Sequence, residues 1–207
     1  MKHTKKLLSL LLVLCLILSL SCTAFAADEA KPLTGKTVIL HSNDVHGAID
    51  LYAAMASLKA DYEAQGAEVI LADAGDYSQG TVYVSVHKGA DAVTMMNATG
   101  YDVATIGNHE IDYGLAHLLF LEKCADFPII NANLHIKSNG RRMFRPFWIA
   151  HIDDMKILFI GIITEEVLAA TKTDELIGSF VDIGEAAREV GNICNAYNAI
   201  DIVSPCC

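Results

Sequence analysis

The feature that most constrains the fold is a regular alternation of short β-branched runs with helical segments. Strands are expected where apolar residues run together between turn signals, and helices where they recur at three- and four-residue spacing. Such alternation is typical of an α/β protein with a largely parallel sheet. The pattern predicts strands at 37–42, 69–72, 103–106, 128–131, 141–150, 156–161 and 200–203, and helices at 51–65, 91–98, 113–124 and 181–199.

The first 26 residues are predicted to be a cleaved export signal. A basic start (KHTKK) precedes an apolar run at 7–20, and residues 24–26 (AFA) have the small-x-small pattern of a signal-peptidase site. The apolar run, about 14 residues, is shorter than a bilayer span. An uncleaved anchor is one alternative, and Cys22 suggests a lipoprotein, although Ser19 stands where a lipobox needs an apolar residue. We therefore expect a periplasmic, cell-envelope or extracellular protein with no stable membrane partner after cleavage.

Composition excludes several classes of protein. The net charge of −10 excludes a generic binder of nucleic acid polymers, because attraction to phosphates needs positive charge. A hydrophobic content of 53% excludes a disordered polar chain. Beyond the signal the cysteines are Cys124, Cys194, Cys206 and Cys207, which allow three disulfide pairings but are too few to replace a core.

Polar residues gather directly after the first three predicted strands, at the edge where an open α/β sheet places its binding site. They are residues 43–47 (NDVHG), Gly75-Asp76 and residues 107–112 (GNHEID). Asp44 and His46 are two positions apart, so both side chains can point to one side, and a carboxylate with an imidazole suits a divalent metal ion. Each motif alone is weak, since a single Gly-Asp is usually a turn. Their order at successive strand ends favours a metal site.

These motifs resemble the first three motifs of the calcineurin-like metallophosphoesterases. Residues 40–47 (LHSNDVHG), 73–81 (DAGDYSQGT), 106–114 (IGNHEIDYG) and 131–134 (NANL) resemble, more narrowly, the exported 5′-nucleotidase branch with its UDP-sugar hydrolases and 2′,3′-cyclic phosphodiesterases. The resemblance runs from residue 36 to about 203. It implies a β sandwich flanked by helices (αββα), present here in part, and hydrolysis of a small-molecule nucleotide or other phosphoester.

The resemblance also implies two divalent metal ions, such as Zn, Mn or Co, and a role for each site residue. The ligands would be Asp44 and His46 on one ion, Asp76 shared by both ions, and Asn108 on the second. Two ions about 3.5–4 Å apart lower the pKa of a bound water that attacks phosphorus. His109 would be the catalytic histidine, stabilising developing charge or protonating the leaving oxygen, and Asp112 would orient it. Asp112 alternatively caps the helix that follows.

The later histidine motifs of the family are not matched in this sequence. His41 lies inside the first strand and is predicted to be structural, and four further histidines do not fall at matching strand ends: His87, His117, His135 and His151. The predicted organisation is a signal peptide at 1–26, a lead-in at 27–35, a partial catalytic domain at 36–203 and an atypical tail at 204–207. Two hypotheses follow: an exported metal-dependent phosphoester hydrolase, or a catalytically inactive, truncated remnant that binds metal weakly.

Overall fold

The computed structural model describes residues 31–152, 154–164, 177–180 and 183–197. The predicted signal peptide, residues 27–30 of the lead-in, the predicted strand at 200–203 and the tail at 204–207 lie outside the described residues. Within the described part, none of the helices has both the length and the apolar character needed to cross a bilayer.

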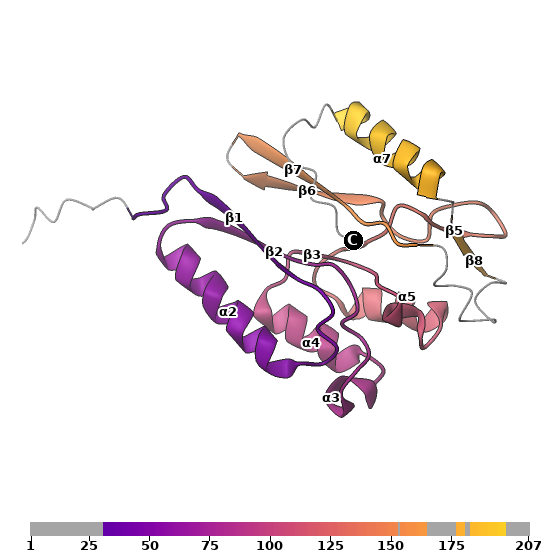
Figure 1. The fold of residues 1–207 in the computed structure, drawn as a ribbon, viewed down its shortest axis with the longest axis horizontal. Coiled ribbons are helices and arrows are strands. Elements are labelled where there is room, and N and C mark those ends of the chain that lie inside the picture. The colour runs from indigo at the N-terminus through magenta and orange to yellow at the C-terminus, as the bar shows by residue number, and fades with distance from the viewer. Residues whose placement is uncertain (1–30, 153, 165–176, 181–182, 198–207) are drawn as a thin grey trace, which may run out of the picture.

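A four-stranded parallel sheet lies at the centre of the fold (Figure 1). Its strands are ordered as in the sequence: β1 (Thr37–Ser42), β2 (Glu68–Asp73), β3 (Val103–Thr105) and β4 (Ile129–Ile130). β1 and β2 are in register from Thr37 opposite Glu68 to Ser42 opposite Asp73. The carboxyl ends of these strands therefore lie at one edge, as the sequence pattern predicted.

Three helices cover one face of this sheet, each connecting two successive strands (Figure 1). They are α2 (Ile49–Ala64), α4 (Ala90–Thr99) and α5 (Leu115–Cys124), and their positions confirm the predicted helices with shifted ends. Met55, Met96 and Leu118 bring one buried side chain from each helix into the core beneath the sheet. Two short elements were not predicted, α3 (Val82–Ser85) and the 3₁₀ helix η1 (His109–Ile111), because neither is long enough to show a helical period.

An antiparallel hairpin of β6 (Phe147–Ile152) and β7 (Met155–Ile160) packs on the opposite face of the sheet. Ile157 and Phe159 of the hairpin share a buried cluster with Ile70 and Val103 of the sheet. The helix α7 (Ile183–Tyr197) lies outside the hairpin, with Ile193 in the outer cluster. The layers therefore run helix, sheet, sheet, helix (Figure 1), which confirms the predicted αββα arrangement.

The predicted strand at 141–150 is wrong in its first half. β6 begins at Phe147, directly after Pro146, which has no N–H to donate to a ladder. The preceding residues make only isolated bridges, Arg142 with His135 and Arg145 with Ile130. A further antiparallel pair, β5 (Leu134–Ile136) with β8 (Gly178–Phe180), was not predicted, because three-residue strands exist only through their distant partner.

Candidate metal centre

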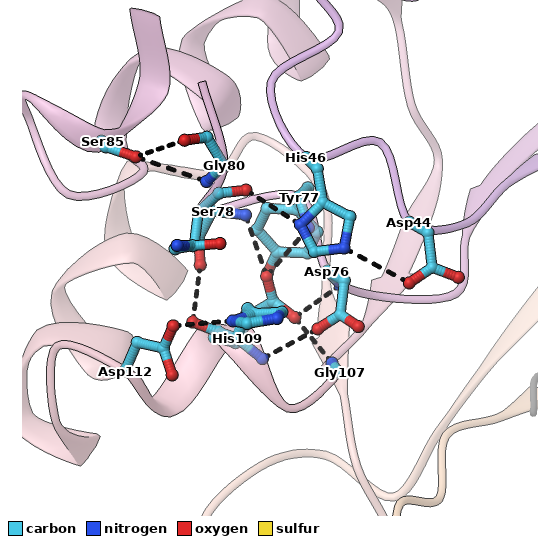
Figure 2. Close-up of polar contacts among 12 residues, drawn as sticks. Asp44, His46, Asp76, Tyr77, Ser78, Gly80, Ser85, Gly107, His109 and Asp112 are labelled. Carbon is cyan, nitrogen blue, oxygen red and sulfur yellow. Dashed lines mark hydrogen bonds and ion pairs between the residues drawn. The ribbon is translucent and has the colours of Figure 1, made fainter. Parts of the chain in front are cut away.

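The loops that leave β1, β2 and β3 meet at the carboxyl edge of the sheet (Figure 2). The backbone N–H of Asp44 donates to the carbonyl of Gly75 at 3.1 Å, and that of His46 donates to the carbonyl of Asp76 at 3.0 Å. The N–H of His109 donates to Oδ1 of Asp76 at 2.8 Å. Hydrogen bonds therefore join each loop to the next, and the polar side chains converge.

Asp44, His46 and Asp76 form the candidate metal cluster. Ligand atoms from the three side chains all lie within 4.8 Å of one another, and His46 Nε2 is 3.4 Å from Asp44 Oδ1. His46 Nδ1 lies 3.2 Å from the carbonyl of Gln79, which favours a proton on Nδ1 and leaves Nε2 free to bind a metal ion. Two carboxylates and one imidazole are a donor set that fits divalent Zn, Mn or Co.

Left-handed backbone conformations orient the side chains of Asp44, His46 and Asp76. Among the described residues, non-glycine residues with positive φ are Asp44 (53°), His46 (47°), Asp76 (61°) and Lys88 (52°). This conformation costs about 1–2 kcal/mol for each side chain with a Cβ. The sequence expectation that Asp44 and His46 point to one side is met, but through tight turns rather than through the alternation of an extended strand.

His109 and Asp112 lie beside the cluster as a hydrogen-bonded pair. Their Nδ1 and Oδ2 atoms are 2.7 Å apart, and the His109 ring meets the His46 ring edge to face with centroids 4.9 Å apart. Desolvation lowers the pKa of His109, but the hydrogen bond and charge of Asp112, with the charges of Asp76 and Glu110, outweigh it, so the pKa is raised. The capping alternative for Asp112 is wrong, since α5 begins at Leu115 after Gly114.

Asn108, the fourth predicted ligand, is exposed at the start of η1, next to His109. Asn108 lies in the same loop as His109, whose N–H donates to Asp76. Its role as a metal ligand stays a prediction. The remaining histidines do not join the cluster within the described part of the chain. His87 pairs with Asp91 at 2.7 Å, and His117 Nε2 lies 2.7 Å from the carbonyl of Lys88.

Two glycines allow the second and third loops to approach closely. A Cβ on Gly75 would lie 2.3 Å from the backbone nitrogen of Gly107. A Cβ on Gly107 would lie 2.3 Å from Oδ1 of Asp76. Both distances are shorter than any side chain tolerates, so the loops can meet only because both residues lack a Cβ. The close approach of these two loops therefore depends on Gly75 and Gly107.

Two buried carboxylates at the site were not singled out from the sequence. Glu110 has no exposed surface and accepts backbone hydrogen bonds from both loops. Asp73, at the end of β2, accepts a 2.5 Å bond from the Ser42 hydroxyl and a 2.8 Å bond from the N–H of Gly75. Burial raises the pKa of Asp73 to about 8. An acidic residue at a strand end or in a polar loop is usually exposed, so no local pattern distinguishes Asp73 and Glu110.

Comparison with known proteins identifies the family, although no family model matches the chain. The 5′-nucleotidase of Vibrio cholerae is 35% identical over 181 residues, which cover 81% of this chain and 32% of that protein. Protein UshA of Escherichia coli is 34% identical over 155 residues, covering 70% of this chain and 28% of that protein. The crystal structure of the calcineurin-like phosphoesterase YfkN from Bacillus subtilis matches with a TM-score of 0.66 at 29% identity, covering 80% of this chain and 59% of that one.

The chain belongs to the 5′-nucleotidase branch of the calcineurin-like phosphoesterases. It spans about a third of the length of the V. cholerae relative. A 5′-nucleotidase precursor from Thermus thermophilus, at 23% identity and a TM-score of 0.66, supports the shared fold.

Proposed function

We propose that this chain carries the metal-binding portion of an exported phosphoester hydrolase of the 5′-nucleotidase type. One observation carries the proposal: the cluster of Asp44, His46 and Asp76 and the His109–Asp112 pair meet at one edge of the parallel sheet. Relatives named 5′-nucleotidase support a small nucleotide or related phosphoester as the substrate. Export is supported by the basic, apolar and small-x-small pattern of residues 1–26.

The metal ions would be held by the residues of the three loops. Asp44, His46 and Asp76 would hold one ion, and Asp76 together with Asn108 would hold a second. Bound metal would supply Lewis acidity and a water of lowered pKa. Asp76 is buried, whereas the Asp44 side chain is 57% exposed. The cluster therefore opens toward solvent, as a site that takes up metal ions and substrate must.

His109 acts on the phosphoester as a proton donor or as a stabiliser of negative charge. Asp112 engages Nδ1, which leaves Nε2 as the atom available to substrate. The raised pKa of His109 increases the fraction of its charged form near neutral pH. A cation beside the metal cluster favours the transition state, in which charge builds on the phosphoryl and leaving oxygens.

The test uses the purified full chain with Mn²⁺, Co²⁺ or Zn²⁺ added after chelation. We expect metal-dependent hydrolysis of nucleoside 5′-monophosphates or p-nitrophenyl phosphate, and metal analysis measures ions per chain. His109→Asn should reduce turnover about 10²–10⁴-fold, the usual contribution of an acid–base group. His87→Asn is the matched control, because His87 makes the same 2.7 Å contact with a carboxylate outside the cluster.

Two results would contradict the proposal: no metal-dependent turnover, or equal turnover by the wild type and His109→Asn. Weak binding of metal without turnover would instead favour the inactive remnant, the second hypothesis from the sequence. Asp76→Asn separates metal binding from chemistry, since it removes the bridging carboxylate and should reduce the number of ions bound.

A further inference from the structure

The carboxylate of Glu110 is the meeting point of two loops. Its Oε2 accepts hydrogen bonds from the backbone N–H of Asp76 at 2.7 Å and of Gly107 at 2.6 Å. Its Oε1 accepts from the N–H of Tyr77 and of Ser78, both at 3.0 Å. Three donors belong to the loop after β2 and one to the loop after β3, and Figure 2 labels these four residues.

Because Glu110 is buried, its carboxylate and the four N–H groups depend on these hydrogen bonds. Glu110 is 0% exposed, and a buried carboxylate is tolerated only when hydrogen bonds replace its hydration. The four N–H groups also need an acceptor, because an unpaired buried donor costs about 1–3 kcal/mol. Hydrogen bonds from N–H groups to a charged acceptor are roughly twice as strong as neutral ones. Each loop is therefore held in place by the same side chain.

The Glu110 contacts bear directly on two residues of the proposed site. One bond fixes the N–H of Asp76, whose φ of 61° lies in the strained left-handed region. Asp76 in turn accepts the N–H of His109 at 2.8 Å, and His109 precedes Glu110 in the chain. Because Glu110 has no exposed surface, it touches neither solvent nor a ligand in the open cluster.

We propose that Glu110 is a positioning residue that fixes Asp76 relative to His109 and assembles the site before metal or substrate binds. The inference rests on the proposed function, because positioning matters only if Asp76 binds a metal ion. The hydrogen bonds of Glu110 to the two loops are present in the metal-free protein. Without Glu110, the loop after β2 loses its acceptor for three consecutive N–H groups. The backbone of Asp76 is then held only through its carbonyl, which accepts the N–H of His46, and its N–H has no acceptor.

Glu110→Gln tests the proposal with little change of volume. The Gln amide has only one acceptor oxygen, which can keep two of the four hydrogen bonds. Its NH₂ group is a donor and would face the other two N–H groups, which then lose their acceptor. Ile157→Ala is the control for lost stability: Ile157 is buried in the β6–β7 hairpin cluster, and its truncation costs about 2–5 kcal/mol without touching either loop.

The first measurement is amide hydrogen exchange by NMR on the metal-free chain. In Glu110→Gln we expect the N–H groups of Asp76, Tyr77, Ser78 and Gly107 to exchange at least about tenfold faster relative to the rest of the core. Ile157→Ala should speed exchange without singling out these four. Unchanged protection of the four N–H groups in Glu110→Gln would overturn the proposal.

The second measurement is a Co²⁺ titration followed by visible absorption. We expect Glu110→Gln to bind Co²⁺ about 10–100-fold more weakly and with altered bands, as is usual when groups that orient metal ligands are lost. Unaltered affinity and bands would show that Glu110 supports only the fold, and would overturn its positioning role. Ile157→Ala should keep the wild-type spectrum.

The two measurements separate this inference from the proposed function. If the wild type binds no Co²⁺, the proposed metal site fails, and the exchange of the four N–H groups alone decides whether Glu110 holds the loops. If Glu110→Gln does not fold, Glu110→Asp replaces it, because a carboxylate one methylene shorter keeps only part of the four bonds. Loss of protection confined to those four groups supports the proposal, and full protection overturns it.

Discussion

The buried carboxyl group of Asp73 should make the stability of this protein depend on pH in an unusual direction. Asp73 is 1% exposed, and burial raises its pKa from 3.8 to about 8, partly opposed by the Ser42 hydroxyl and the N–H of Gly75. The folded chain therefore keeps a proton that the unfolded chain releases near pH 4. The contribution to stability is complete below about pH 4 and is lost as the pH rises through about 8.

The size of this effect follows from the shift. Each pH unit inside the window is worth about 1.4 kcal/mol, so between pH 5 and pH 7 the unfolding free energy should fall by about 3 kcal/mol on account of Asp73. Asp73→Asn cannot ionise and should lack this fall. The difference between the two proteins reports the titration of Asp73 together with its charge interactions with Glu110 and Asp76.

The assay is urea unfolding at pH 5 and pH 7 in the presence of a chelator. The difference in unfolding free energy between the wild type and Asp73→Asn should change by about 3 kcal/mol between the two pH values. The control is Asp61→Asn, at an exposed site on α2, for which we expect the same difference at both pH values. Equal pH dependence of the wild type and Asp73→Asn would refute the reasoning. It would mean that Asp73 is ionised in the folded protein.

Three further substitutions test the site and one helix. Gly107→Ala places a Cβ 2.3 Å from Oδ1 of Asp76 and should weaken Co²⁺ binding at least about tenfold in a titration; unchanged affinity would contradict the close approach. Gly191→Ala meets no atom within 4 Å in α7 and should stabilise the fold by about 0.5–1 kcal/mol in urea, with metal binding unaltered. Asp112→Asn should lower the pKa of His109 in an NMR titration, since the hydrogen bond and charge of Asp112 raise it; an unmoved pKa would show that Asp112 does not act on the ring.

Local patterns were sufficient for the elements that carry the site. β1 spans Thr37–Ser42 as predicted, because its β-branched run is bounded by Gly35 and by the polar turn that follows. α2 and α5 follow from apolar spacing over ten residues or more. Local sequence patterns did not predict β5 and β8, which pair across a long stretch of sequence. Each strand has three residues, and their register is set only by contact with each other.

The sequence by itself determined which residues stand at the strand ends. The parallel strands place the loops that carry Asp44, Asp76 and His109 at one edge of the sheet, and the spacing of three residues between His109 and Asp112 lets the two side chains meet in a helical turn. These relations need only secondary structure and the direction of the strands, so the motif order was enough to predict a shared site.

Only the tertiary structure decided how the site is built. The left-handed backbone at Asp76, the contact of Gly75 with Gly107, and the burial of Asp73 and Glu110 all depend on atoms that lie far apart in the chain. Glu110 and its donor Tyr77 are separated by 33 positions. A carboxylate has the same local sequence whether water or four N–H groups surround it, and only the packed loops replace the water.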